Sequence, residues 1–376
     1  YGPSYVPLWD IHRFKDGTSF YFASRNTIAY YLDPRNFFVD VPSAYMDDLK
    51  NLGSIFMFSS NAYFENQDGN VTNKILAGTF LSRERTSTVT YKDQTGASIT
   101  TDKSYIDLIM DASTYSGAGA YFIATRMKME ITVGGEPSSA VWCDHPDRDI
   151  FDPTGIYDGI YNYYNIYASD SSTPYQNIIN GLYFAKNGFK TDYPTDTSDP
   201  TVNANNAQRN ATNQSLNNEY LLPWTSPERA IKGGARYLAK NYILAGQHTL
   251  YLQKWDVNPS SSTFTTHQYM SSVHAPAGES YGLAVSYRDL GLLNEAFVFD
   301  IPVYQNMPST PVSIATETRS TNNLIASLGI RAGEVESTPI FDPLTSEPIV
   351  VYVDANVESV TIFGRKAGYR STLMVN

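Results

Sequence analysis

The stretch from residue 226 to 245 constrains the fold of this chain more than any other, because it carries the marks of a buried helix. Thr225 and Glu228 have the spacing of a capping box, and Pro227 stands in the expected first turn. Apolar side chains recur along one side at helical spacing, at Ile231, Ala235, Leu238 and Tyr242. Gly246 then provides a C-terminal stop, so we predict a helix across this stretch.

Two adjacent glycines, Gly233 and Gly234, stand inside that predicted helix. Each glycine in a helix interior costs about 1 kcal/mol relative to alanine. We therefore expect another part of the chain to approach this side of the helix closely.

Other segments of the chain show helical or irregular patterns. Helices are predicted at 104–117 and 120–131, and a helix-containing segment at 174–190. The Thr-rich and Ser-rich segment 86–103 is typical of a hairpin or an exposed loop. Residues 191–220 have almost no apolar periodicity, so we interpret them as a surface insertion.

The pattern changes again after about residue 310. Residues 309–322 are rich in Ser, Thr and Pro, as a linker is. Val350–Val353 and Val357–Phe363 alternate with polar residues in the way that strands do. We therefore predict a mainly α chain of the α+β type, with a small and incomplete β module near its C-terminal end.

The balance of charge and the scarcity of cysteine exclude several classes of protein. Over 376 residues, 38 acidic side chains against 27 basic ones leave a net charge of −11. General nucleic-acid binding and tight docking on anionic lipid both need a basic face, so this charge disfavours both functions. No apolar run reaches the roughly 18 residues that span a bilayer. The single cysteine, Cys143, excludes an intrachain disulfide and a four-cysteine metal site, and the five histidines lack the spacing of a zinc hydrolase. We expect neither a metal nor a cofactor.

Glu130 is the carboxylate that most resembles a general acid. It falls near the end of the predicted helix 120–131, on a side that is otherwise apolar, with Ile123 and Met127. A helix C-terminus and apolar neighbours both favour the neutral acid, which a general acid has to be at neutral pH. Arg126, one turn earlier, works against this if the two side chains pair, and from spacing alone an ion pair on a helix surface is the commoner arrangement.

Polar and aromatic residues gather in two further places. The run from Tyr157 to Ile166 holds four tyrosines, two asparagines and Asp158, which suits a sugar-binding groove, because a tyrosine offers a flat ring with a hydroxyl tip. A buried segment with asparagine turns explains the same run equally well. The run from His267 to Met270 places a histidine and an amide beside a phenol, and a structural role is the commoner one for such a pair.

Several of these stretches, in order, resemble one known family. Ala124 to Glu130 read A-T-R-M-K-M-E, and Tyr161 to Ala168 read Y-N-Y-Y-N-I-Y-A. Pro223-Trp224 precede the predicted helix, Gly246 to Trp255 read G-Q-H-T-L-Y-L-Q-K-W, and the region from His267 to Pro308 contains H-Q-Y-M and I-P-V-Y-Q-N-M-P. In kind, order and spacing they resemble the peptidoglycan-cleaving endo-β-N-acetylglucosaminidases, glycoside hydrolase family 73 of the lysozyme-like superfamily.

The resemblance implies a domain organisation. It implies a lysozyme-like hydrolase domain at 104–308, preceded by an extension at 1–103 that packs on it. A linker at 309–322 then leads to residues 323–376, which resemble the start of a cadherin-like β-sandwich repeat. The chain begins at Tyr1 without a methionine, and we expect it to be part of a longer, multidomain chain.

The resemblance also implies a reaction, the hydrolysis of the β-1,4 bond between N-acetylglucosamine and N-acetylmuramic acid in peptidoglycan strands. Glu130 matches the family's catalytic glutamate and is the expected general acid. Asp158 is expected to orient water or stabilise positive charge, unless the substrate's own 2-acetamido group assists, and Tyr269 to orient that group or the water. The residues expected to bind the glycan are Arg126, Tyr161, Asn162, Tyr164, Asn165, Gln247, Tyr251, Gln253, Trp255, His267 and Gln268.

Two departures from the family pattern bear on the shape of the cleft. Met129 stands where the family has glutamine, and Tyr167 stands where it has glycine. They leave the cleft shape and the substrate preference open more than the identity of the acid.

Other functions stay open on the same sequence. A lytic transglycosylase, a non-catalytic wall-binding or structural protein, and a phage-borne hydrolase all fit the same pattern. The expected location is extracellular, in the cell wall or at the cell surface, with a phage tail or virion as the alternative. The acidic loop with Asp144, Asp147, Asp149 and Asp152 fits a solvated loop better than a calcium site, because its spacing matches no EF-hand.

Overall fold

Helices dominate the chain, which confirms the predicted mainly α class. The computed structural model describes residues 4–7, 20–37, 53–133, 136–137, 148–168, 175–269, 271–313, 324–339, 348–367 and 372. Contacts divide the chain into two compact units: a central unit of residues 59–249 and 286–300, and a split unit of residues 1–58, 250–285 and 301–376. The predicted domain boundaries after residues 103, 308 and 322 stay predictions.

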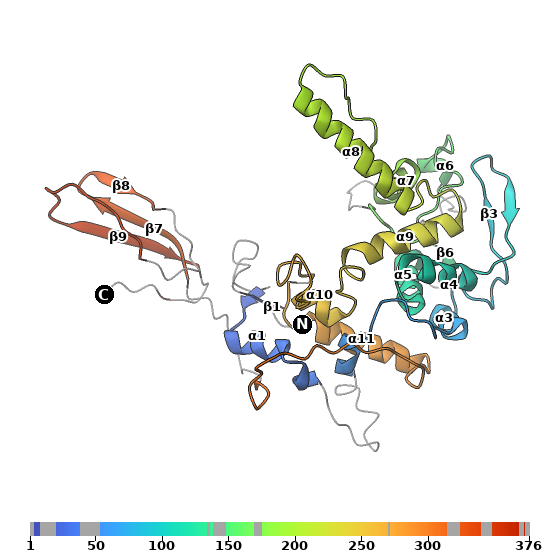
Figure 1. Ribbon diagram of the computed structural model, residues 1–376, viewed down its shortest axis with the longest axis horizontal. Coiled ribbons are helices and arrows are strands. Elements are labelled where there is room, and N and C mark those ends of the chain that lie inside the picture. Colours follow the sequence, from blue (N-terminus) through green and yellow to red (C-terminus); the bar gives the residue numbers. More distant parts are fainter. Residues whose placement is uncertain are drawn as a thin grey trace. The chain divides into compact units, whose positions relative to one another are not determined.

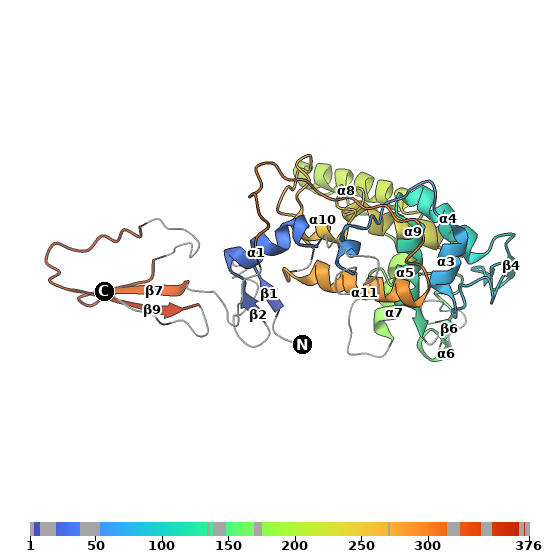
Figure 2. The ribbon, with the colours of Figure 1, turned by 90° about the horizontal axis from the view of Figure 1, so that it is seen from below.

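The central unit is built mainly from helices: α3 (Gly69–Leu76), α4 (Tyr105–Ser116), α5 (Ala120–Ile131), α6 (Arg148–Phe151), α7 (Gln176–Asn187), α8 (Pro200–Glu219) and α9 (Pro227–Asn241). Two antiparallel hairpins accompany them, β3 (Thr90–Lys92) with β4 (Ser98–Thr100), and β5 (Thr132–Val133) with β6 (Glu136–Pro137). The helix α4 packs against α9, α3 and α5 (Figures 1 and 2). The helices predicted at 104–117, 120–131 and 174–190 are therefore confirmed, and of the two alternatives for 86–103, a hairpin or an exposed loop, the structure has the hairpin.

Local signals in the sequence explain where α4 begins and ends. The hydroxyl of Ser104 accepts the N–H of Asp107 at 3.2 Å, and the Asp107 carboxylate accepts the N–H of Ser104 at 2.9 Å, which closes a capping box. Gly117 follows the helix with φ +80°, a backbone conformation that glycine adopts without steric cost. The next helix, α5, turns Ile123 and Met127 into the core.

The glycine pair of α9 is explained by two close neighbours. A Cβ atom on Gly233 would collide with the carbonyl oxygen of Tyr220, and one on Gly234 with the ring of Tyr164. The predicted close approach is therefore confirmed. The predicted cap is wrong by one residue, because the hydroxyl of Ser226, and not that of Thr225, accepts the N–H of residue 229.

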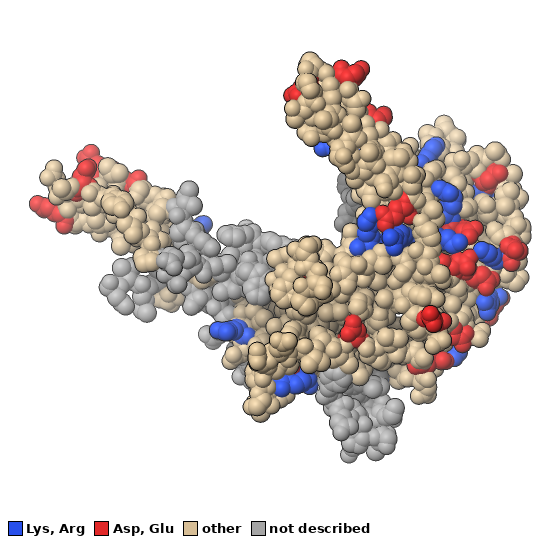
Figure 3. Space-filling view, in the orientation of Figure 1, with Lys and Arg blue, Asp and Glu red and all other residues tan. Residues whose placement is uncertain are grey.

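The segment predicted as an irregular surface insertion contains the 20-residue helix α8. Asp199 caps it by accepting the N–H of Thr201 at 2.8 Å. The face of α8 that is seen in Figure 3 is largely uncharged. Asparagines recur at helical spacing along one side and bond the backbone of residues 189–197, which runs beside the helix: Asn203, Asn206, Asn210, Asn213 and Asn217. The prediction missed α8 because the repeating residues that fasten this helix are amides rather than apolar side chains.

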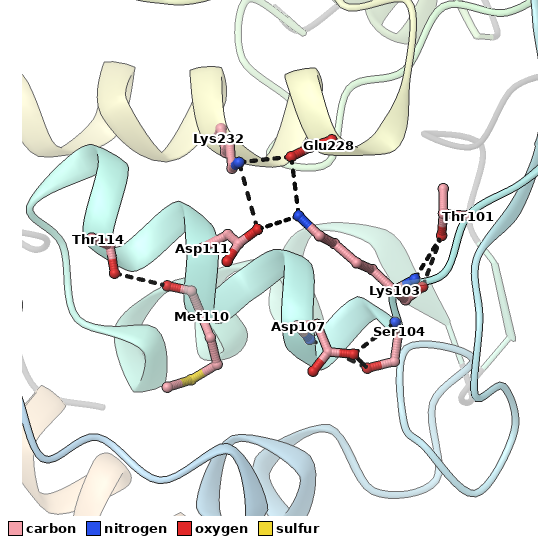
Figure 4. Close-up of polar contacts among 9 residues, drawn as sticks. All are labelled: Thr101, Lys103, Ser104, Asp107, Met110, Asp111, Thr114, Glu228 and Lys232. Atoms are coloured by element: carbon pink, nitrogen blue, oxygen red, sulfur yellow. Dashed lines mark hydrogen bonds and ion pairs between the residues drawn. The ribbon is translucent and has the colours of Figure 1, made fainter.

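A square of alternating charges joins α4 to α9 (Figure 4). The ammonium of Lys103 lies 2.7 Å from the Asp111 carboxylate and 3.6 Å from that of Glu228. Lys232 closes the square, 2.7 Å from Glu228 and 3.6 Å from Asp111. The hydrogen bond from Lys232 lowers the pKa of Glu228, although partial burial of the carboxylate opposes this.

The split unit combines short elements from distant parts of the chain. They are β1 (Ser4–Val6) paired in parallel with β2 (Phe20–Phe22), α1 (Arg25–Leu32), the 3₁₀ helices η2 (Pro34–Phe37) and η4 (Phe56–Phe58), α10 (Leu250–Trp255) and α11 (Ala275–Asp289), whose last residues belong to the central unit. The helix η2 bonds the chain where the predicted linker begins. Arg35 donates to the carbonyl of Pro308, just before the linker, at 2.8 Å, and Asn36 donates to that of Val312, within it, at 3.0 Å.

The predicted β module forms a sheet of three antiparallel strands in the order β8 (Val335–Ser337), β7 (Ile325–Ala332) and β9 (Val360–Lys366). The strand β9 overlaps the predicted strand Val357–Phe363. The predicted strand Val350–Val353 is wrong, because these residues pair with no strand among the described residues. Alternation alone did not make a strand there, since a strand also needs a partner for its backbone hydrogen bonds.

The segment between α5 and α7 is only partly described. It contains the short hairpin of β5 and β6 and the single turn of α6. Among the helices that the structure describes, none is long and apolar enough to cross a bilayer.

Candidate active site

Glu130 lies one residue before the end of α5. Ile123 and Met127 on the same side of the helix are fully buried, whereas 30% of the Glu130 side chain is exposed. Glu130 therefore stands at the edge of the core, where a carboxylate can meet both the protein and a ligand. The predicted ion pair is present, with Nη2 of Arg126 at 3.6 Å from Oε1 of Glu130.

Asn165 holds Glu130 from the neighbouring loop. Its amide nitrogen donates to the backbone carbonyl of Glu130 at 2.6 Å and lies 3.5 Å from the carboxylate oxygen Oε2. The backbone of Asn165 is left-handed, with φ +50°, a conformation that asparagine tolerates better than most residues. The loop is thus fastened to the last turn of α5 at the residue expected to be the acid.

Asn162 stabilises the loop that carries Asn165. It is 3% exposed, and its amide donates to the carbonyls of Ile166 at 2.9 Å and Gly181 at 3.2 Å. Its side-chain oxygen accepts the N–H of Ile166 at 3.2 Å. Asn162 was predicted to bind the glycan, but its hydrogen-bonding groups are directed to the protein backbone.

Tyr161 and Tyr164 are also buried rather than exposed to a groove. The hydroxyl of Tyr161 donates to the carbonyl of Lys92 at 2.7 Å, and that of Tyr164 to the carbonyl of Ile231 at 2.9 Å. Burial raises the pKa of Tyr164 well above its usual range. In this structure both rings pack the core behind the loop, so the alternative of a buried segment with asparagine turns describes them better.

Asp158 and Asp152 lie in the turns that precede this loop. Asp158 is partly buried, its N–H donates to the carbonyl of Gly155, and its catalytic role stays a prediction. Asp152 is buried, and its two oxygens accept the N–H groups of Ile156 and Tyr157 at 2.8 and 2.9 Å. The described residues contain no cluster of three or more metal-ligating side chains, and Asp144 and Asp147 lie outside them.

The remaining predicted residues, apart from Gln247, belong to the split unit, around α10. Tyr251 is fully buried, and its hydroxyl contacts the carbonyl of Leu32 and lies 2.6 Å from the hydroxyl of Tyr304. Gln253 and Trp255 are 9% and 3% exposed, and Gln247 in the central unit is fully buried. These four side chains were predicted to bind the glycan, but in this structure they are packed within the protein.

The loop after α10 carries the residues of this group that are open to solvent. Its backbone is held by Asp256, which accepts the N–H of His267 at 2.9 Å, and by the carbonyl of Gln253, which accepts the N–H of Tyr269 at 2.8 Å. His267 and Gln268 are partly exposed, and the Tyr269 side chain is 48% exposed. Their expected roles in binding and catalysis stay predictions.

The structure adds Tyr167 to the predicted residues. The side chain is 52% exposed, and the backbone has φ +61°, which costs a residue other than glycine roughly 1–2 kcal/mol. The sequence held a signal for this position, because the tyrosine replaces the family's glycine, but only the structure shows that the ring is exposed near Asn165.

No family model matches this chain. Over 82 residues it is 35% identical to the bifunctional autolysin of Staphylococcus epidermidis, and over 83 residues 30% identical to that of Staphylococcus aureus. Each match covers 22% of this chain and 6% of the relative, so the matched segment spans a small part of these proteins.

Solved structures with a detectable likeness come from the same group of proteins. The major bifunctional autolysin is 17% identical with a TM-score of 0.41, over 81% of this chain and 89% of that one. S. aureus glucosaminidase B is 16% identical with a TM-score of 0.39, over 72% and 74%. A catalytic mutant of S. aureus autolysin E, in complex with the disaccharide NAG-NAM, is 17% identical with a TM-score of 0.32, over 77% and 86%. The sequence matches to bifunctional autolysins agree with the predicted resemblance over 22% of this chain, and the cadherin-like tail stays a prediction.

Proposed function

We propose that this chain is an endo-β-N-acetylglucosaminidase that hydrolyses the β-1,4 bond between N-acetylglucosamine and N-acetylmuramic acid in peptidoglycan. The observation that supports it best is the placement of Glu130, partly exposed at the end of α5 and held by Asn165 through its carbonyl. The sequence similarity to bifunctional autolysins supports the same reaction class. A wall-degrading enzyme acts outside the membrane, so we propose an extracellular or cell-surface location.

The proposed chemistry begins with a proton from Glu130 to the bridging oxygen of the glycosidic bond. Cleavage leaves positive charge on the sugar ring, in a transition state that resembles an oxocarbenium ion. Asp158 is the proposed second group, either to orient the attacking water or to stabilise that charge. Assistance by the substrate's 2-acetamido group is the alternative, and it needs no second carboxylate.

The roles proposed for the other residues follow from the exposure and the contacts of their side chains. Arg126 lies 3.6 Å from Glu130, too far for a strong hydrogen bond, and 36% of its side chain is exposed. A guanidinium in that state has N–H groups left to donate to carbonyl oxygens of the glycan. Tyr269 is the proposed residue for orienting the acetamido group, and Asn165 acts on the reaction through Glu130.

The test is the Glu130→Gln variant, which keeps the shape of the side chain but cannot supply an acidic proton. We expect it to abolish clearing of a peptidoglycan zymogram. Glu228→Gln is the matched control, because it changes a glutamate of the same unit that lies in the charged square between α4 and α9. Undiminished clearing by Glu130→Gln contradicts the assignment.

Product analysis separates the rival functions. Hydrolysis adds water and leaves a reducing N-acetylglucosamine end, whereas a lytic transglycosylase leaves an anhydro product, and mass spectrometry of the released muropeptides distinguishes the two. Binding to the wall without any product indicates a non-catalytic protein. Asp158→Asn tests the second group, because a large loss of activity supports a carboxylate role and near-normal activity supports substrate assistance.

A further inference from the structure

Tyr167 is an exposed aromatic residue of the loop that bonds the backbone of the proposed acid. It follows Asn165 by two residues, and the Asn165 amide bonds the carbonyl of Glu130 at 2.6 Å. Because successive Cα atoms are about 3.8 Å apart, the Cα atom of Tyr167 lies within about 7.6 Å of that of Asn165. More than half of the side chain, 52%, is exposed.

The ring is mounted on a rigid aromatic support. Its centroid lies 4.2 Å from that of Phe184, with the two planes 28° apart, so Phe184 covers one face. Phe189 and Tyr237 lie farther away, at 6.4 and 6.1 Å, and are turned by 84° and 59°. Phe184 itself is buried and packs edge-on against Trp224. The side chain is thus held by an aromatic neighbour on one face and keeps 52% of its surface exposed.

The stacking on Phe184 accounts for one face of the ring, and a side-chain hydrogen bond joins Tyr167 to Tyr237. The backbone is left-handed, which glycine adopts most readily, and about half of the side chain stays exposed. An exposed, immobilised ring is suited to a pyranose, because one side of a sugar ring presents C–H bonds to the electron-rich face of an aromatic ring.

We propose that Tyr167 is a stacking platform for one N-acetylhexosamine ring of the glycan, carried by the loop that bonds the proposed acid through Asn165. This inference rests on the proposed function for the identity of the glycan. The platform binds substrate and takes no part in proton transfer, so its loss acts on affinity and on KM.

The experiment measures binding of a tetramer of N-acetylglucosamine by calorimetry, in full-length Glu130→Gln protein so that no cleavage occurs. Adding Tyr167→Gly removes the ring and suits the left-handed backbone, and we expect affinity to fall about tenfold. Adding Tyr167→Phe keeps the ring and loses only the hydroxyl, and we expect affinity within about twofold of the parent. Equal binding by the parent and the glycine variant, including an equal lack of binding, overturns the proposal.

A control and an activity measurement complete the test. Tyr63 is also exposed, and its N–H bonds the carbonyl of Gly117, at the other end of α5 and about 15 Å from Glu130 along the helix. Tyr63→Ala is expected to leave tetramer affinity unchanged. In otherwise wild-type protein, Tyr167→Gly is expected to raise KM about tenfold and to leave kcat within about threefold.

The two proposals fail in different ways. If Glu130→Gln still cleaves peptidoglycan, the proposed acid is wrong, whereas a ring-dependent affinity still supports the platform. If Glu130→Gln is inactive but the affinity does not depend on the ring, the platform is wrong and the proposed function stands. Circular dichroism and the melting temperature of each variant show whether it is folded.

Discussion

At the scale of single residues, Asn165 connects the packing of the central unit to the proposed chemistry. Its amide bonds Glu130, and its loop is held in turn by the buried Asn162. Asn165 was predicted to bind the glycan, but in this structure its amide is directed to Glu130. We therefore treat it as a positioning residue, one that acts through the carboxylate it holds.

We predict that Asn165→Ala lowers kcat by roughly 10- to 100-fold and leaves KM within about twofold. The reason is that a small misplacement of a reacting group costs about this much in rate. Steady-state kinetics on a soluble peptidoglycan fragment measures both constants. Asn165→Gly, which suits the left-handed backbone but lacks the amide, is expected to show the same loss.

A rise in KM at unchanged kcat contradicts the positioning role and supports direct binding of the glycan. Asn205→Ala serves as the control, because Asn205 lies on the exposed side of α8. It is expected to change neither constant.

At the scale of elements, α9 shows how packing overrides helix propensity. Alanine is the better helix former by about 1 kcal/mol, yet Gly233 and Gly234 lie where a Cβ atom would collide with Tyr220 and Tyr164. The close approach of these neighbours to the backbone, rather than the local preference of the chain, explains the glycines.

We predict that Gly234→Ala lowers the free energy of unfolding by roughly 1–3 kcal/mol, since the ring of Tyr164 must shift in a packed core. Denaturant unfolding measures it. Gly278→Ala on α11 is the matched control, because a Cβ atom there meets nothing within 4 Å. It is expected to be neutral or to raise the free energy of unfolding by about 0.4–1 kcal/mol.

The helix α8 is held in place by the amides along one of its sides rather than by apolar packing. Asn210 both accepts the N–H and donates to the carbonyl of Tyr193, at 2.9 Å each. We predict that Asn210→Ala speeds hydrogen exchange at the Tyr193 amide while the free energy of global unfolding changes by no more than about 1 kcal/mol. Asn205→Ala is expected to leave that amide as protected as in the wild type, and unchanged protection in Asn210→Ala contradicts the proposed role of the amide.

At the scale of the whole molecule, carboxylates in ion pairs make the free energy of unfolding depend on pH. The hydrogen bond from Lys232 lowers the pKa of Glu228. For Glu219, partial burial acts in the opposite direction, but hydrogen bonds from Lys240 and Arg236 lower its pKa overall. A carboxylate whose pKa is lower in the folded protein stabilises the fold above its unfolded pKa, near 4.3, and loses that effect as pH falls through the folded value.

We predict that Glu228→Gln melts at a lower temperature than the wild type at pH 7, by the equivalent of about 0.3–0.5 kcal/mol, and that this difference shrinks as pH falls through the folded pKa of Glu228. At low pH the wild-type carboxyl group is neutral as well, so the two proteins converge. Melting curves between pH 7 and pH 3 measure the difference. Glu65→Gln changes an exposed glutamate of the same unit, and its melting temperature is not expected to converge with that of the wild type as pH falls. A difference in melting temperature between Glu228→Gln and the wild type that stays constant with pH contradicts the prediction.

The sequence by itself determined the features that depend on local chemistry. The cap at Ser104, the stop at Gly117 and the helices that contain Glu130 and the glycine pair follow from neighbouring residues, because capping and helical spacing act within a turn or two of the chain. The identification of Glu130 as the candidate acid also came from a contiguous motif.

The tertiary structure decided what depends on contacts between distant residues. It buried Tyr161 and Tyr164, left Tyr167 exposed, and fastened α8 through amides whose partners lie on a neighbouring segment. It also left Val350–Val353 without a strand partner among the described residues. The physical reason is that burial and strand pairing are properties of a pair of surfaces, and one stretch of sequence specifies only one of the two.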